Sequence, residues 1–409
     1  MMTVDEFKSL CASLEIDESL QIDSSMRLGP TVVSTGPTRA MTGNPFVATR
    51  PVHDLELHET IGEGGMGLVR SATQHALRRQ VAVKTLKPDV ETGEATNTLL
   101  HEALVTGRLE HPNVVPIYTL GETEHGAPII VMKRITGVSW LQCIQNPQAA
   151  PDFRPDDPLG WHLDIFEEVC LATHFAHSRE IIHRDIKPEN VMVGAFGEVY
   201  LLDWGVAVTV EEDKSGPLLH VTEATGICGT PMYMAPEMAA GESHRIGPRS
   251  DVYLLGATLY HVLTGDPPHQ GRSAYQVLMS AYISEPPKFP DDIPDALVKI
   301  CHKAMARDPD DRYQTADELR HALIDALQEA ELRAKETDRI EATVCAAYGL
   351  HPVMVGLFSS AEMNGGLADS IEPAYRAAGM FDASALVHSG GDTLVVHDVA
   401  NARLSWALP

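Results

Sequence analysis

The residues whose types and spacing suggest chemistry are concentrated in one stretch, Ile182–Val191, which has the sequence IHRDIKPENV. Phosphoryl transfer needs a carboxylate that accepts the proton of the attacking hydroxyl, oxygen ligands for Mg²⁺, and cations beside the phosphates. Asp185 can be that carboxylate. Asn190, and Asp203 at the end of the next apolar strand, supply the hard oxygen atoms that Mg²⁺ prefers. The pattern therefore predicts a phosphoryl-transfer site that uses Mg²⁺.

A glycine-rich run, Ile61–Val69 with the sequence IGEGGMGLV, matches the pattern G-x-G-x-x-G. Glycines allow a tight turn whose N–H groups can approach phosphate oxygens. The same pattern occurs in dinucleotide-binding sites, but those need a helix directly after the loop. Here Leu68–Ala72 continues as a strand, and Val81–Lys84 is predicted to form another. The run therefore favours a phosphate-binding β-hairpin.

Lys84 ends an apolar strand, where burial requires a carboxylate or phosphate to offset the loss of hydration. The natural carboxylate is Glu102, in the helical stretch Thr96–Leu109. The alternative is a surface lysine and a solvated helix glutamate, which the neighbouring motifs make less favourable.

Composition limits the possible functions. The 409 residues include 31 Lys and Arg against 57 Asp and Glu, a net charge of −26, which disfavours nucleic acid and anionic membrane surfaces as partners. A hydrophobic fraction of 44% is typical of a globular protein. No stretch has the length and apolarity of a membrane span, and the six cysteines are scattered without a C-x-x-C pair. We expect a soluble cytoplasmic protein with reduced thiols.

The elements that must position these residues change in type along the chain. Strand-like runs come first, at Val81–Leu86 and Ile129–Ile135, and helical stretches follow. The helical stretches are Asp164–His177, Val252–Leu263 and Ala316–Ala330. This order predicts a small sheet-rich lobe followed by a larger helical lobe.

The two ends of the chain and one internal stretch lie outside that pattern. Val4–Leu14 has apolar residues at helical spacing and is predicted to be a packing helix, or else a partner-docking motif. Asp23–Pro51 is predicted to be a linker, and Gln145–Pro158 a surface insert. The last helix is expected to continue through Glu331–Ala347, followed by a small accessory module or packed extension at Gly349–Pro409.

With these motifs in chain order, residues 55–327 resemble a eukaryotic-type (Hanks-type) serine/threonine protein kinase domain of the sort also found in bacteria. The further matching segments are Leu109–Val115 (LEHPNVV), Gly229–Glu237 (GTPMYMAPE), Ser250–Gly256 (SDVYLLG) and Asp308–Tyr313 (DPDDRY). The resemblance implies an α+β, bilobal protein-kinase fold with a small β-rich N-lobe and a larger α-helical C-lobe. It also implies three parts: an N-terminal helix and linker over 1–54, the kinase domain over 55–327, and a C-terminal extension over 328–409.

The resemblance further implies ATP-dependent transfer to serine or threonine hydroxyls of proteins, including the chain itself. Asp185 would be the catalytic base, Lys187 would contact the γ-phosphate, and Lys84 would bind the α- and β-phosphates while paired with Glu102. Asn190 and Asp203 would bind Mg²⁺, with Met132 as gatekeeper. The residues expected to bind ATP are Ile61, Gly62, Gly64, Gly67, Val69, Ala82, Lys84, Met132, Lys133, Ile135, Asn190 and Asp203.

Structural and regulatory roles follow from the same resemblance. Glu237 and Arg312 would form a buried ion pair that steadies the substrate-binding loop, and Asp251 would hold the catalytic loop. Trp204 stands where the family usually has phenylalanine, so its packing is open to question. Arg184 would need an anion, supplied by a phosphorylated residue; the candidates are Thr209, Ser215, Thr222 and Thr225, of which the last two lie nearest Gly229.

Other interpretations remain. A pseudokinase would keep the fold without catalysis, but every catalytic position has the required residue type. A small-molecule phosphotransferase would share the lysine, aspartate and metal ligands, whereas the segment Ala235–Glu237 favours protein substrates. The pair His174 and His177 has the spacing of zinc ligands, but it lacks the further partners that zinc requires.

Overall fold

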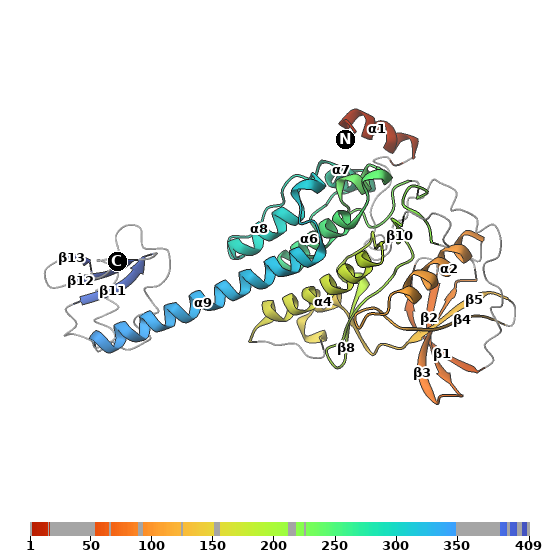
Figure 1. The fold of residues 1–409 in the computed structure, drawn as a ribbon, viewed down its shortest axis with the longest axis horizontal. Coiled ribbons are helices and arrows are strands. Elements are labelled where there is room, and N and C mark those ends of the chain that lie inside the picture. The colour runs from red at the N-terminus through yellow and green to blue at the C-terminus, as the bar shows by residue number, and fades with distance from the viewer. Residues whose placement is uncertain are drawn as a thin grey trace. The chain divides into compact units, whose positions relative to one another are not determined.

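The computed structural model describes residues 2–14, 16, 54–64, 67–88, 93–123, 126–150, 156–211, 218–224, 226–348, 385–390, 393–398 and 403–406. These residues divide into two compact units, Met1–Ile324 and Asp325–Pro409. Figure 1 shows the order of the elements along the chain. The expected linker Asp23–Pro51 lies outside the described residues.

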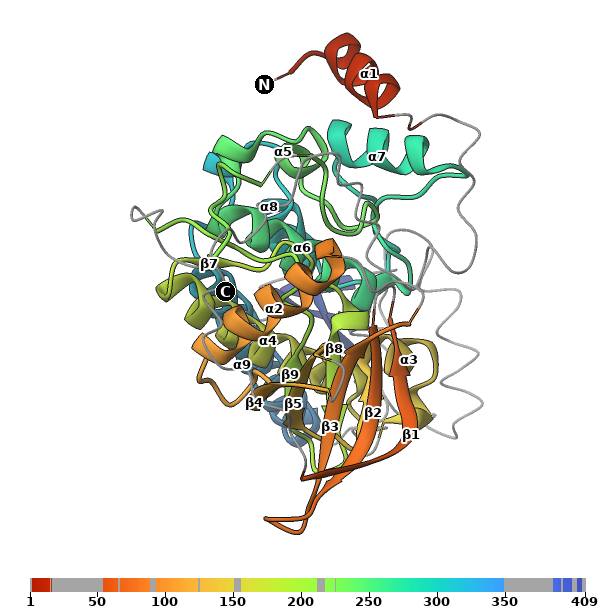
Figure 2. The same cartoon turned by 90° about the vertical axis from the view of Figure 1, so that its right-hand side faces the viewer.

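The first unit contains an antiparallel five-stranded sheet in the order β1-β2-β3-β5-β4. Its strands are β1 (Leu55–Glu63), β2 (Gly67–Gln74), β3 (Arg79–Leu86), β4 (Ile117–Glu122) and β5 (Pro128–Lys133). The predicted strands Val81–Leu86 and Ile129–Ile135 correspond to β3 and β5. This sheet is the small β-rich lobe, and Figure 2 shows its strands side by side.

Alternation along β3 determines what each of its side chains faces, because neighbouring residues of a strand point to opposite faces of the sheet. Val81 and Val83 pack in one fully buried cluster on one face. Leu86 joins a second cluster, where Leu99 and Ala103 of α2 (Gly93–Arg108) cover the other face. Lys84 reaches α2, where it pairs with Glu102.

The helical lobe follows and is built around α4 (Pro158–Ser178) and α6 (Pro248–Thr264). In α6 the side chains from Ser250 to Leu259 are all buried, so this helix forms the centre of the lobe. The remaining elements are α3 (Trp140–Gln145), η1 (Pro147–Ala149), α5 (Pro236–Ala239), η3 (Ser243–Arg245), α7 (Ala274–Ile283), α8 (Asp295–Ala304), η4 (Pro309–Asp311) and the start of α9 (Ala316–Tyr348). The predicted insert at 145–158 contains η1, and residues 151–155 are outside the described part.

Two small sheets in this lobe carry the loops that bear the chemical motifs. One has the order β6-β8-β9 and the other pairs β7 with β10. Their strands are β6 (Gly137–Ser139), β7 (Ile181–Ile182), β8 (Val191–Gly194), β9 (Val199–Leu201) and β10 (Val208–Thr209), with η2 (Pro188–Asn190) before β8. Asp185 therefore lies in the loop from β7 to β8, and Asp203 in the loop from β9 to β10.

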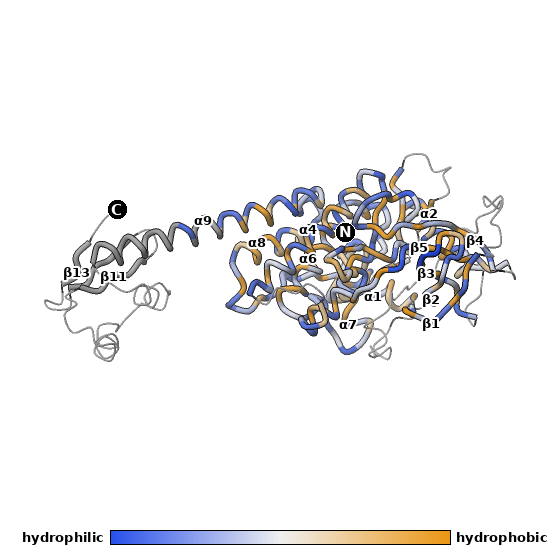
Figure 3. The backbone as a smooth tube through the Cα atoms, turned by 90° about the horizontal axis from the view of Figure 1, so that it is seen from below, coloured by the Kyte–Doolittle hydropathy of each residue, from blue (hydrophilic) through white to orange (hydrophobic). Residues whose placement is uncertain are grey.

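The predicted N-terminal helix is present as α1 (Val4–Ser13), which begins with a capping box formed by Thr3 and Glu6. Hydrophobic residues are spread through many short elements of the first unit (Figure 3). Among the residues that the structure describes, no helix is long and apolar enough to cross a membrane.

The second unit contains the rest of α9 and an antiparallel sheet in the order β11-β12-β13. Its strands are β11 (Ala385–Gly390), β12 (Thr393–Asp398) and β13 (Arg403–Trp406). The predicted continuation of the last helix through Glu331–Ala347 agrees with the extent of α9, which runs unbroken past residue 327.

Candidate active site

Lys84 and Glu102 form a close ion pair at the wall of a cleft. The Lys84 Nζ atom lies 2.6 Å from both Glu102 carboxylate oxygens, and both side chains are partly buried. Burial opposes the charged form of Lys84, but the Glu102 carboxylate and then Asp203 outweigh it and raise the pKa of Lys84. Lys84 is therefore a fixed positive charge in the cleft.

Asp185 lies at the centre of a buried polar cluster and is 2% exposed. It accepts a hydrogen bond of 2.7 Å from the Thr230 hydroxyl, and its carboxylate lies 3.0 Å from the Lys187 Nζ atom. Lys187 in turn donates to the Thr230 hydroxyl oxygen. Burial alone would raise the pKa of Asp185, but Lys187 and the Thr230 hydrogen bond lower it below its ordinary value. This carboxylate is ionised at neutral pH and can accept a proton.

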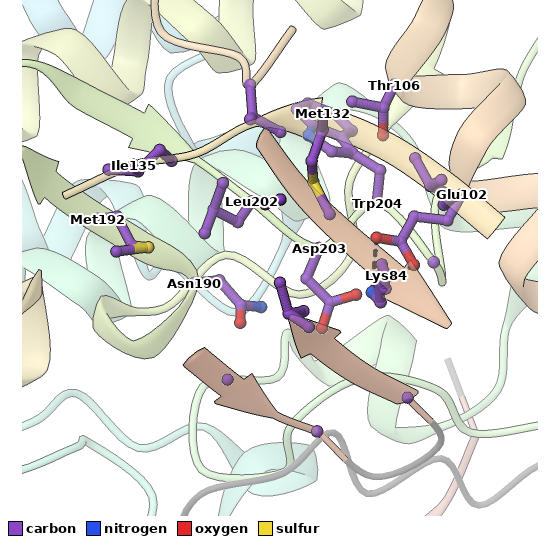
Figure 4. Close-up of a pocket in the computed structure, with 18 of the residues that line it drawn as sticks. Lys84, Glu102, Thr106, Met132, Ile135, Asn190, Met192, Leu202, Asp203 and Trp204 are labelled. Atoms are coloured by element: carbon purple, nitrogen blue, oxygen red, sulfur yellow. Dashed lines mark hydrogen bonds and ion pairs between the residues drawn. The ribbon is translucent and has the colours of Figure 1, made fainter. Parts of the chain in front are cut away.

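Asn190 and Asp203 bring oxygen atoms toward the same space. The Asn190 amide nitrogen donates to the main-chain oxygen of Asp185 at 2.8 Å and to its carboxylate at 3.0 Å. Because the amide nitrogen is used in this way, the amide oxygen is the atom that Asn190 can offer to a cation. Figure 4 shows Asp203 between Asn190 and Lys84.

The cleft has a volume of about 610 Å³. It is lined by every residue that the sequence analysis expected to bind nucleotide. Ala82 and Met132 are directly opposite each other in the β3–β5 pairing. The lining also includes residues that the sequence analysis did not single out, among them Met192, Leu202 and Thr106. Figure 4 shows Met192 and Leu202 toward Ile135, at the end of the cleft away from Lys84.

Close backbone approaches explain two of the glycines. A side chain at Gly67 would place its Cβ 3.0 Å from the main-chain oxygen of Thr85, where β2 and β3 pair. Gly229 has a φ of +112°, and a Cβ there would lie 2.6 Å from the main-chain oxygen of Arg184. Gly229 therefore lets the segment Gly229–Tyr233 pass directly beside the loop that carries Asp185.

Asp251 of α6 fixes the backbone of that loop. Its carboxylate accepts the main-chain N–H groups of His183 at 2.8 Å and Arg184 at 2.9 Å. The same carboxylate accepts a hydrogen bond of 2.8 Å from the ring of His177. Arg184 has a φ of 67° and Asp203 a φ of 62°, a region that non-glycine residues rarely occupy. Such strained residues persist where surrounding contacts define them and are concentrated at functional sites.

Trp204 is fully inside the lobe at 1% exposure. Its ring packs on the ring of His183 with centroids 4.4 Å apart, and its indole nitrogen donates to the main-chain oxygen of Leu201 at 3.4 Å. The larger ring is thus accommodated beside Asp203, which still faces the cleft.

Arg184 and His101 form hydrogen bonds with the main chain of the segment that follows Gly205. The Arg184 Nε atom donates to the main-chain oxygen of Val206 at 2.7 Å. The ring of His101, the neighbour of Glu102 on α2, lies 2.8 Å from the main-chain oxygen of Ala207. His101 was not singled out from the sequence, because nothing in its local pattern distinguishes it from a surface histidine.

The four candidate phosphorylation sites have different environments. Thr209 is buried in β10, and the Thr222 hydroxyl lies 2.8 Å from the ring of His220. Ser215 and Thr225 lie outside the described residues. Arg184 is close enough to Cys228 to offset part of the rise in the pKa of that thiol caused by burial.

Comparison with known proteins agrees with this geometry. The family model described as "Protein kinase domain" matches residues 55–324. The chain is 35% identical over 292 residues to the serine/threonine-protein kinase PknB of Mycobacterium leprae. It is 36% identical over 289 residues to PknB of Mycolicibacterium smegmatis, and 33% identical over 289 residues to the serine/threonine-protein kinase PknD of Chlamydia felis.

These alignments define the class of protein. They cover 69%, 68% and 66% of this chain, and 44%, 44% and 30% of the respective relatives. The chain belongs to the protein kinase family and has its bilobal fold. The matched part spans less than half the length of each of these relatives.

Proposed function

We propose that this chain transfers the γ-phosphate of ATP to serine and threonine hydroxyls of proteins, including its own. The observation that carries the proposal is the convergence of Asp185, Lys187 and Asn190 in one hydrogen-bonded cluster, beside a cleft that also contains Lys84 and Asp203. Phosphoryl transfer depends mainly on positioning and on charge, which this arrangement supplies.

Each side chain has a distinct task in this proposal. Asp185 accepts the proton of the attacking hydroxyl, since its lowered pKa keeps it ionised. Lys187 places a positive charge beside the transferred phosphoryl group, and Lys84 one beside the α- and β-phosphates. Thr230 orients both Asp185 and Lys187 through its hydroxyl.

The donor set fits Mg²⁺. Asn190 and Asp203 offer an amide oxygen and a carboxylate, the hard ligands that this ion prefers, and Glu102 is already committed to Lys84. When bound, Mg²⁺ would neutralise phosphate charge and polarise the phosphoryl oxygens. The chain's own contribution is to hold these two oxygen donors beside Asp185.

Protein substrates are favoured over small molecules or nucleic acid. The segment Gly229–Tyr233 passes directly beside Asp185 and is fixed to it through Thr230, which gives a peptide a backbone to dock against. The net charge of −26 disfavours nucleic acid. We also propose a cytoplasmic location, where free thiols stay reduced. We further propose that the chain has three functional parts, residues 1–54, 55–327 and 328–409, and that the last of these is an accessory part.

The test is to incubate the purified full chain with γ-labelled ATP, Mg²⁺ and a generic Ser/Thr protein substrate, and to map labelled residues. Label on serine or threonine that is lost with EDTA supports the proposal. Binding of ATP without any transfer would indicate a pseudokinase instead. Transfer only to added small hydroxyl compounds would indicate a small-molecule phosphotransferase.

Replacing Lys84 by Met should lower the rate of transfer by roughly 10²- to 10³-fold, the loss typical of removing one electrostatic contact to the reacting groups. The variant leaves the phosphates uncompensated and Glu102 without its cation. Steady-state rates of Lys84→Met are compared with those of wild type and of the control variant Lys87→Met. Thermal unfolding of each variant shows whether it is folded. Wild-type rates in Lys84→Met would mean that another cation contacts the phosphates.

Replacing Thr222 and Thr225 together by Ala should lower activity on an external substrate by roughly tenfold, the scale of one charge-assisted hydrogen bond. The expected reason is that Arg184 lacks the phosphate that would order this loop. Ser215→Ala, at the candidate site further from Gly229, serves as the control. Phosphosite mapping accompanies the rates, and undiminished turnover in the double variant would show that the loop needs no phosphate.

A further inference from the structure

The first helix packs on the helical lobe at the last turn of α7. The ring of Phe7 stacks on the ring of Tyr282, with centroids 4.1 Å apart and planes 3° from parallel. Phe7 and Cys11 are both fully buried. The Tyr282 hydroxyl also donates to the main-chain oxygen of Met2. Figure 2 shows α1 lying next to α7.

A second attachment joins α1 to the segment that follows α5. The main-chain N–H of Met2 donates to the Glu242 carboxylate at 3.1 Å. Glu242 itself continues from α5, because its main-chain N–H donates to the Glu237 carbonyl at 2.9 Å. The N-terminal segment that includes α1 therefore contacts both α7 and the residues after α5. In the chain, α5 begins shortly after the proposed peptide-docking segment Gly229–Tyr233.

The last turn of α7 is connected to that segment. Tyr253 bonds through its hydroxyl to Ser284 at 2.7 Å and to the ring of His269 at 3.0 Å. Ser280 approaches the same ring at 3.4 Å. The main-chain N–H of His269 then donates to the Met232 carbonyl at 3.2 Å. Tyr282 lies between Ser280 and Ser284, so the turn that α1 covers is the turn that contacts His269.

We propose that α1 is a positioning element for the segment Gly229–Tyr233, and that Phe7 is the residue through which it acts. The proposal rests on the proposed function, since its consequence is binding of a peptide substrate. A helix of this length has little stability alone in water, so α1 and its contact with α7 form together. Packing on the last turn of α7 suppresses its local opening and thereby stabilises the contact from His269 to Met232.

The geometry favours support of this segment over blockage of the site. In the described part of the chain, α1 contributes no residue to the lining of the ATP cleft. Its contacts with Tyr282 and Glu242 involve two residues that do not line the cleft either. Thr230 of that segment orients Asp185, yet it is held there by its own hydrogen bonds. Loss of α1 packing should therefore weaken peptide docking more than the chemical step.

The test uses the full chain with Phe7→Ala, the conservative variant Phe7→Tyr, and Lys8→Ala, which lies on the exposed face of the same helix. Phe7→Ala should raise the KM for a Ser/Thr peptide by roughly threefold to tenfold, within the range found for residues that act through packed networks. The KM for ATP and kcat should stay within about twofold of wild type. Phe7→Tyr keeps the stacked ring but adds a hydroxyl at a fully buried position, so its effect should be smaller than that of Phe7→Ala. Lys8→Ala should match wild type, because the Lys8 side chain is exposed.

Amide hydrogen exchange of the nucleotide-free protein gives an independent measurement. Phe7→Ala should speed exchange in α7 and in residues 229–233, with β1 to β3 unchanged. Phe7→Leu keeps an apolar side chain but removes the stacked ring, so exchange should increase less than in Phe7→Ala. This variant separates the loss of the stacked ring from general misfolding.

Several results would overturn the proposal. Unchanged peptide KM and unchanged exchange in Phe7→Ala would show that α1 does not support the segment. A lower peptide KM, or faster turnover, would show that α1 blocks the site instead. If wild type transfers no phosphate, the proposed function fails, and the exchange experiment still decides the role of α1.

Discussion

Replacing Asp203 by Ala, or Asp185 by Asn, is expected to lower phosphate transfer by about 10³-fold or more, because the first change removes the proposed Mg²⁺ ligand and the second the proposed proton acceptor. Asp185→Asn retains the shape of a side chain that is 2% exposed but cannot accept the hydroxyl proton. Asp203→Ala removes a carboxylate between Asn190 and Lys84 (Figure 4). Initial rates with labelled ATP, and mapping of the labelled residues, measure both losses.

Nucleotide binding distinguishes these two variants from each other. Asp185→Asn should bind ATP nearly as well as wild type, since Asp185 faces Thr230 and Lys187 and does not line the cleft. Asp203→Ala should bind ATP with weaker dependence on Mg²⁺. Retained transfer in Asp185→Asn would remove Asp185 from the role of base, and a full Mg²⁺ response in Asp203→Ala would remove Asp203 from the metal site.

The polar centre of the site could be predicted because each member has a local sequence signal. Lys84 follows the buried apolar run Val81–Val83, and a cation in that position requires a carboxylate. Glu102 of α2 pairs with Lys84 and is next in sequence to Ala103, which packs against the sheet. Chain order and side-chain chemistry were therefore sufficient to pair two residues from different elements.

The apolar walls of the cleft could not be predicted in the same way. Met192 lies in β8, and Leu202 directly follows β9, which pairs with β8. That pairing brings both residues to the lining of the cleft. Neither residue has a local pattern that separates it from ordinary core. The contact between His101 and Ala207 likewise depends on how α2 lies over the segment after Gly205.

The packing of Trp204 and the position of α1 were open questions for the same reason. Sequence showed a larger ring beside Asp203, but whether the lobe had room for it depends on His183 and the surrounding core. Sequence also showed the apolar stripe of α1 without its partner. Tyr282 is far away in the chain, and the stacking of its ring on Phe7 arises only in the folded protein.

The ion pair between Glu237 and Arg312 underlies the largest expected effect on stability. The two carboxylate oxygens of Glu237 lie 2.8 and 2.9 Å from the guanidinium of Arg312, and both side chains are almost completely buried. Arg312 also donates to the main-chain oxygens of Arg249, Ala306 and Arg307. These five hydrogen bonds use every N–H donor that a guanidinium has.

Replacing Arg312 by Met alone should therefore lower the free energy of unfolding by about 3–5 kcal/mol, because it leaves the charge of Glu237 buried without a partner. Urea titration of the two-lobed unit within the full chain, followed by tryptophan fluorescence, measures the change. The double variant Glu237→Met with Arg312→Met removes the buried charge as well and should recover part of the loss. Recovery should stay incomplete, since three carbonyls and the Ser250 hydroxyl, which donates to Glu237 at 2.7 Å, also lose their partners. An exposed ion pair would contribute less than about 1 kcal/mol. If Arg312→Met lowered the free energy of unfolding by only that amount, the pair would not stabilise α5 as its burial indicates.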